Sequence, residues 1–149
     1  MMMFAYDPAS NPLNNNEWSF PLLECIHIAG FALSIGTIVL VDLRLLGLAM
    51  RTQASAVLAK TLAPWTLVGL AVMLITGPLI FSSDPNMYLR NISFKFKMVA
   101  LLTAILYHYT LHRWAVFRAP APAIGKLVAV FSIALWVSVV AGGLFIAFF

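Results

Sequence analysis

Long runs of apolar residues, separated by short polar breaks, fill most of this 149-residue chain. A helix that crosses a membrane needs about 20 mostly apolar residues in succession. Four segments are long enough, and they cover about Trp18–Leu48, Leu62–Phe81, Phe94–Phe117 and Ile124–Phe149. Backbone groups inside lipid must find partners within their own segment, and the strands of a membrane barrel would alternate apolar and polar residues. The pattern therefore predicts an all-α fold, an integral membrane four-helix bundle.

The polar breaks predict an N-terminal tail over residues 1–17 and one transmembrane domain over residues 18–149. Prolines and a run of asparagines predict that the tail is an irregular periplasmic segment. No basic residue precedes the first apolar run, which predicts a retained helix rather than a cleaved signal peptide. In the second run, Pro64 is expected to mark a helix start, and Pro78 is expected to kink or end the helix.

Composition and charge agree with a membrane location. The chain is 62% hydrophobic and 9% charged, whereas a soluble domain carries roughly 25% charged residues. The net charge of +4 could suggest a nucleic-acid partner. However, most basic residues flank the first and third connections, namely Arg44, Arg51, Lys60, Arg113, Arg118 and Lys126. The positive-inside rule then predicts that both termini lie outside the cytoplasm of a bacterial inner membrane. Lipid is the expected partner and nucleic acid is not.

The three histidines, His27, His108 and His112, all lie within or at the end of an apolar run. Ionisable residues at membrane depth are costly and are usually functional. Glu24 and His27 are three residues apart and share a helix face, a spacing found in di-iron bundles. Such bundles also need carboxylates from the other helices, and the other three runs contain none. Glu24 is instead expected to bond near the interface or to orient the His27 ring.

The third run has a stripe of residues at helical spacing, formed by Lys97, Leu101, Ala104 and His108. His112 lies one turn further on. His108 and His112 could chelate a metal from one face. The favoured interpretation is that His112 joins Arg113 as an interfacial cation near a helix C-terminus.

Depth leaves the partner of His27 open. At 1.5 Å per residue, His27 lies about 13 Å into the first run, while Lys97 and His108 lie about 5 Å and about 21 Å into the third. The two runs enter from the same side, so His27 lies between Lys97 and His108 in depth. Either residue could face it across the bundle.

The first run ends with Asp42 and Arg44, which are two residues apart and point to different helix faces. We expect them to have different partners or to reach the interface by snorkelling. The single cysteine, Cys25, excludes an intrachain disulfide.

Two stretches carry a resemblance to a known family: PLLECIHIAGFALSIGTIVLVDLRLLGL and, further on, FKFKMVALLTAILYHY. With the motifs LLExxHxxG and VDLRLLG, they resemble an uncharacterised bacterial family of four-helix inner-membrane proteins of about this length. That resemblance implies a fold and no activity.

The chain is more distantly similar to the haem-binding four-helix protoporphyrinogen oxidase of bacteria and to CopD-type membrane proteins. The oxidase family has a histidine early in its first helix and a lysine that opens its third, and His27 and Lys97 match these positions. Gly142-Gly143-Leu144 stands where that family often has an arginine after glycine. The likeness implies haem binding, and the oxidase reaction is not carried over.

These observations predict a b-type haem protein that moves electrons within the membrane, with quinone or a redox protein as partner. His27 is the expected axial ligand, and His108 or Lys97 the opposite contact; His27 and His108 are also the candidate metal ligands. Glu24 is expected to orient His27 or to meet a haem propionate. The protein would be a homo-oligomer or a subunit of a larger respiratory complex. The alternatives are a non-catalytic accessory subunit and a copper-handling or metal-handling protein. No catalytic residue is assigned, and whether the protein is an enzyme stays open.

Overall fold

The computed structural model describes residues 6–148 and is 86% helical, with no strand among those residues. The main elements are α1 (Ser19–Leu46), α2 (Ser55–Ser83), α3 (Pro85–Arg90), α4 (Ile92–Tyr107), the π-helical turn η3 (His108–His112), α5 (Arg113–Arg118) and α6 (Pro122–Leu144). Short 3₁₀ turns precede α1 and follow α6, at η1 (Pro8–Ser10), η2 (Pro12–Asn14) and η4 (Phe145–Phe148). The prediction of an all-helical protein is confirmed.

Three helical stretches are long and apolar enough to cross a membrane: Ser19–Leu46, Ser55–Ser83 and Pro122–Phe148. They indicate a membrane protein. The third expected span is divided into α4, η3 and α5, although the chain stays helical from Ile92 to Arg118. With 16 residues, α4 alone is shorter than the stretch of about 20 that spans a bilayer.

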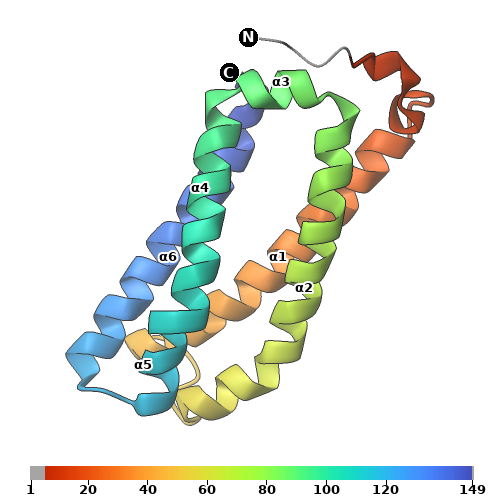
Figure 1. The fold of residues 1–149 in the computed structure, drawn as a ribbon. Helices are drawn as coiled ribbons and strands as arrows, with labels where there is room; N and C mark the ends of the chain where they lie inside the picture. Colours follow the sequence, from red (N-terminus) through yellow and green to blue (C-terminus); the bar gives the residue numbers. More distant parts are fainter. Residues whose placement is uncertain (1–5, 149) are drawn as a thin grey trace.

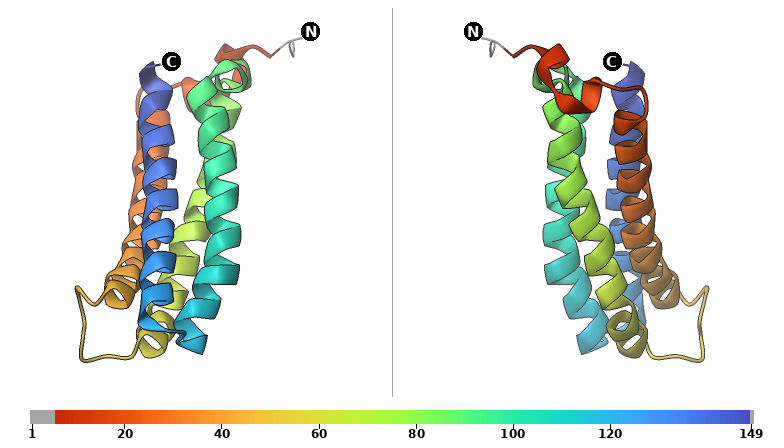
Figure 2. Two further views of the ribbon diagram at one scale, coloured as in Figure 1. Left: turned by 90° about the vertical axis from the view of Figure 1, so that its left-hand side faces the viewer. Right: turned by 90° about the vertical axis from the view of Figure 1, so that its right-hand side faces the viewer.

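The long helices lie in two pairs, α1 beside α2 and α4 beside α6, and α1 also contacts α6 (Figures 1 and 2). The first and last described segments lie at the same end of the molecule as α3, which we call the α3 end. The connections over residues 47–54 and 119–121 lie at the opposite end. We call this the basic end, because several basic residues lie in its connections and in the helix segments next to them: Arg44, Arg51, Arg113 and Arg118.

Local capping residues set the ends of several helices. Gly47 ends α1 in a left-handed conformation with φ 78°, which glycine adopts without strain. Asp84 caps α3 by accepting a 3.0 Å hydrogen bond from the Met87 amide, and Asn91 caps α4 by accepting one of 3.0 Å from the Phe94 amide. These caps place the short α3 as a bridge between α2 and α4.

Glycine allows α1 and α2 to approach very closely. A Cβ atom at Gly69 would lie 2.6 Å from both the carbonyl oxygen of Gly30 and the amide nitrogen of Ser34. Small residues at such crossings are typical of helix packing in membranes. Further apolar side chains fill the core between the two pairs, namely Ile38, Leu70, Met73, Ala100, Leu101, Ala104, Trp136 and Val139.

The sequence-based expectation for Pro64 is wrong. Helix α2 begins at Ser55, well before Leu62, and both Pro64 and Pro78 lie inside it. Pro78 does not end the helix at once, since α2 continues to Ser83. A long apolar helix tolerates internal proline when neighbouring helices and hydroxyl side chains satisfy the freed backbone groups.

The N-terminal tail is anchored to the end of α2. The Tyr6 hydroxyl and the Asn11 side-chain amide both donate to the carbonyl oxygen of Ser82, the latter over 2.7 Å. Asn14 donates to the carbonyl oxygen of Ser83 over 3.0 Å. These bonds satisfy carbonyl groups that the helix end would leave without partners. The tail is therefore two short 3₁₀ turns held against the α3 end.

Candidate functional site

His27 is half-buried on α1, and its ring is held by α2. Its Nδ1 atom lies 2.7 Å from the Thr76 hydroxyl oxygen. The same hydroxyl donates to the Val72 carbonyl oxygen over 2.7 Å, so we infer that it accepts the Nδ1 proton of His27. The Nε2 atom is then left with a free lone pair. A histidine that donates one ring N–H to an acceptor and offers its other nitrogen is the usual form of a metal-ligating imidazole. Thr76 thus takes the orienting role expected of Glu24, which is exposed.

Lys97 is half-buried on α4 and packs against two glycines of α6. A Cβ atom at Gly142 would lie 3.0 Å from the Lys97 Cβ, and one at Gly143 would lie 3.4 Å from its Nζ. In the part of the chain that the structure describes, no carboxylate pairs with this ammonium group. Its charge acts on the His27 ring, so the two side chains lie within electrostatic reach of each other.

His27 and His108 are not brought together. His108 lines the same cavity as Ile38, which follows His27 by eleven residues on α1. At 1.5 Å per residue this is a separation of about 16 Å along the helix. Two axial ligands of one haem iron must approach the same atom. Of the two partners that the sequence leaves open for His27, Lys97 lies within electrostatic reach, whereas His108 lies at a different depth in the bundle.

A second group of polar side chains lies deep in the bundle towards the basic end. Asp42 on α1 is 0% exposed and His112 on η3 is 2% exposed. The Oδ1 atom of Asp42 lies 2.7 Å from Nε2 of His112. The expectation that His112 is an interfacial cation is therefore wrong. Of the two alternatives for Asp42 and Arg44, the structure shows different partners and not snorkelling of Asp42. Arg44 does point elsewhere, as expected, and donates to the Gln53 carbonyl oxygen.

His108 lies beside this pair. Its ring stacks on the His112 ring with centroids 4.9 Å apart and an interplanar angle of 28°. Within residues 6–148, the buried atoms Nδ1 of His108, Oδ2 of Asp42 and Oγ of Ser132 have no hydrogen-bond partner. Ser132 on α6 lies beside the Asp42 carboxyl group without a bond of standard geometry. Buried polar atoms are normally satisfied, and exceptions point to function or to water.

The two histidines belong to the π-helical turn η3, a feature frequent at functional sites. An extra residue in one turn rotates the rest of a helix by about 100°. Here His112, the last residue of the turn, faces Asp42 on α1. A cavity of about 80 Å³ adjoins the turn, and its polar lining includes Thr37, Thr66 and His108. It has room for ordered water, which needs a site of about 10–15 Å³ or more with polar partners.

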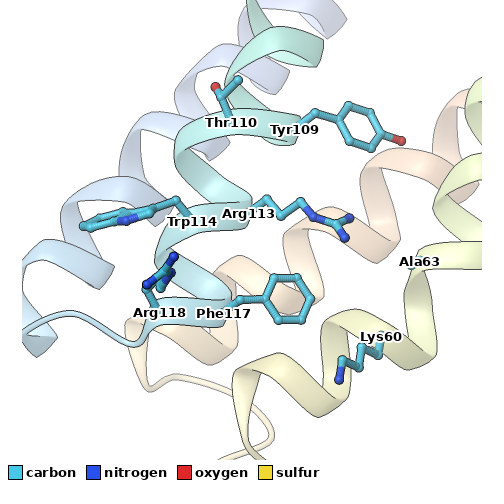
Figure 3. Close-up of a pocket in the computed structure, with 8 residues that line it drawn as sticks. All are labelled: Lys60, Ala63, Tyr109, Thr110, Arg113, Trp114, Phe117 and Arg118. Carbon is cyan, nitrogen blue, oxygen red and sulfur yellow. The ribbon is translucent and has the colours of Figure 1, made fainter.

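An open groove of about 590 Å³ lies between α2 and the helix formed by η3 and α5 (Figure 3). Tyr109, Arg113 and Phe117 extend across it towards α2 (Figure 3). The Phe117 ring has two cations near its face, Arg113 at 5.2 Å and Lys60 at 5.9 Å from the centroid. Arg113 and Phe117 line both this groove and the 80 Å³ cavity, so the two spaces are neighbours. The groove was missed in the sequence, although basic and aromatic residues alternate through residues 109–118.

No three side chains of His, Cys, Asp or Glu come together as a metal-binding group anywhere in residues 6–148. The described structure therefore offers no metal site built from three protein ligands of these types. This applies to His27 and His108, the two candidates from the sequence, which also lie apart from each other.

These features define a small all-helical protein of membrane-spanning character, with buried ionisable residues at two depths. Residues 20–149 match the model of DUF6644, a family of unknown function, and the chain belongs to that family. The expected membership of an uncharacterised family is confirmed, and the family itself brings no activity. No curated protein and no solved structure matches the chain.

Proposed function

We propose that this protein is a multi-pass protein of the bacterial inner membrane that binds b-type haem and transfers electrons. In this proposal four helical rods cross the bilayer: α1, α2, the rod of α4, η3 and α5, and α6. Both termini face away from the cytoplasm. The observation that carries the haem assignment is the bond from His27 Nδ1 to Thr76, because it orients the ring and leaves Nε2 free for iron.

Lys97 is the second residue that would hold the haem in this proposal. It comes from the other helix pair, lies within electrostatic reach of His27 and has no carboxylate partner among the described side chains. Close packing of its Cα and Cβ atoms against Gly142 of α6 fixes the position of Lys97 on α4. Glu24, one turn from His27 and exposed, would interact with a haem propionate. When bound, the haem supplies one-electron redox chemistry, and a quinone or a redox protein would be the electron partner.

An absorption spectrum of the purified protein, oxidised and reduced, tests this proposal. We expect a Soret band after expression with sufficient haem. His27→Ala should abolish the band, and Lys97→Ala should shift or weaken it. The matched control is Lys95→Ala, because Lys95 is exposed on the same helix and should leave the spectrum unchanged. A spectrum that depends on His108 and not on Lys97 would contradict the assignment of the second ligand.

The other candidate functions are outcomes of the same experiment. Absence of a Soret band in the wild-type protein would end the haem proposal and favour a non-catalytic accessory subunit. Stoichiometric copper or another metal in the same sample would favour a metal-handling protein. Such a protein would need ligands from a second copy, because residues 6–148 contain no group of three protein ligands.

A further inference from the structure

We propose that Asp42 and His112 form an intramembrane proton-binding site, which His108 and the adjoining cavity connect to the basic end of the molecule. The site is separate from the proposed haem ligands. The fully buried carboxyl group of Asp42 bonds to His112 at 2.7 Å. Ionisable residues placed inside a membrane bundle commonly mark proton pathways.

The environment favours a single shared proton. In a medium of low dielectric, a buried pair of groups is most stable when its total charge is zero. Asp42 and His112 reach zero with one proton between them, either as carboxylate with imidazolium or as carboxylic acid with imidazole. Both forms keep the bond from Nε2 to Oδ1, so the proton can move along it without a rearrangement of the helices.

His108 provides a route to and from this proton. Its ring stacks on His112, its Nδ1 is buried without a partner in the described structure, and it lines the 80 Å³ cavity. An imidazole can accept a proton at one ring nitrogen and release one from the other. Because the stacked rings share no hydrogen bond in the part of the chain that the structure describes, water in the cavity that both histidines line would carry the proton between them. Arg113 and Phe117 lie between this cavity and the groove in Figure 3, because they line both spaces. Water in the cavity would complete the connection from His108 to the groove.

The groups around the pair come from each neighbouring element. Helix α6 contributes the neutral hydroxyl of Ser132, and α2 contributes the neutral hydroxyl of Thr66 to the cavity. Arg113 of α5 is the cation on the cavity wall, and it balances charge when the pair has lost its proton. Tyr107 of α4 also lies within electrostatic reach of Asp42, and its hydroxyl donates to the Val128 carbonyl oxygen over 3.0 Å.

NMR of protein labelled with ¹⁵N in its three histidines tests this inference. In lipid nanodiscs, a deshielded proton between His112 and Asp42 should be visible and should exchange with deuterated solvent while the protein stays folded. Asp42→Asn should remove this signal. His108→Ala should slow its exchange on the order of tenfold or more, because a positioned imidazole accelerates proton transfer by at least that factor.

Two controls make the result decisive. Leu111→Ala alters the same π turn but lines neither the cavity nor the groove, so it should leave the exchange rate unchanged. The His27 ring in each sample reports that the fold is intact. A bridging proton that exchanges only as slowly as the most protected backbone amides, or an exchange rate unaffected by His108→Ala, would overturn the inference. Neither result depends on haem, because the measurement works on protein with or without it.

Discussion

At the scale of single residues, the environment of Asp42 determines what its substitution does. Its carboxyl group is excluded from solvent, and its one hydrogen bond in the described structure is to His112. Asp42→Ala leaves an imidazole buried without its partner, and His112→Ala leaves an unpaired carboxylate. Removing one member of a buried pair usually costs about 3–5 kcal/mol of folding stability.

We therefore expect each single variant to lower the free energy of unfolding by about 3–5 kcal/mol, and the double variant by clearly less than the sum. Denaturation in mixed micelles, followed by helical circular dichroism, measures the effect. Glu17→Ala, at an exposed position, is the control and should be neutral within about 0.5 kcal/mol. Additive losses would mean that the two side chains do not stabilise each other.

Single residues also show which features of the site the sequence can predict and which it cannot. The stripe of Lys97, Leu101, Ala104 and His108 follows from helical spacing, and in the structure these residues are buried or half-buried. The sequence assigns His112 to the interface because it lies beside Arg113 near the end of its apolar run. Its partner Asp42 lies 70 positions away in the chain, so local pattern could not predict the pairing.

At the scale of helices, Gly69 marks a close crossing of α1 and α2. Gly69 has no room for a methyl group, because its Cβ would lie 2.6 Å from backbone atoms of α1. Backbone cannot move aside as a flexible side chain can. Gly36 lies on the same helix as Gly30, yet a Cβ there would have no neighbour within 4 Å. The chain thus contains its own matched control.

We expect Gly69→Ala to lower stability by about 1–3 kcal/mol, the usual cost of overpacking. Gly36→Ala should be neutral or stabilise α1 by up to about 1 kcal/mol, since alanine favours the helix. Thermal unfolding of both variants in the same detergent measures the difference. Equal melting temperatures would show that α1 and α2 do not pack this closely in the membrane.

The sequence predicts the limits of the first helix better than those of the second. The expected limits of the first span, Trp18 and Leu48, lie close to the observed Ser19–Leu46. The second span was placed too late, because its amphipathic beginning at Ser55 is not apolar enough to stand out in the sequence. Packing of Leu58 against Val41 and Val116 holds that first part of α2 in the helix.

At the scale of the whole molecule, the two ends differ in charge. The first and last described segments share the α3 end, while the basic connections lie together at the opposite end (Figure 1). Basic residues in short loops are retained on the cytoplasmic side. The proposed haem ligands would then lie in the half of the bilayer away from the cytoplasm, and the Asp42–His112 pair in the cytoplasmic half. Electron and proton sites would thus be at different depths.

This arrangement predicts which loops are accessible in intact cells. In a Cys25→Ala background, a membrane-impermeant maleimide should label Asn15→Cys in the tail and Met87→Cys on α3, both exposed, without permeabilisation. Thr52→Cys and Ala121→Cys, in the two connections of the basic end, should react only after the inner membrane is opened. The reverse result would invert the protein and place the Asp42–His112 pair on the periplasmic side. Labelling of Asn15→Cys and Met87→Cys from opposite sides would mean that α1 and α2 do not each cross the membrane, because the tail and α3 share one end of the fold.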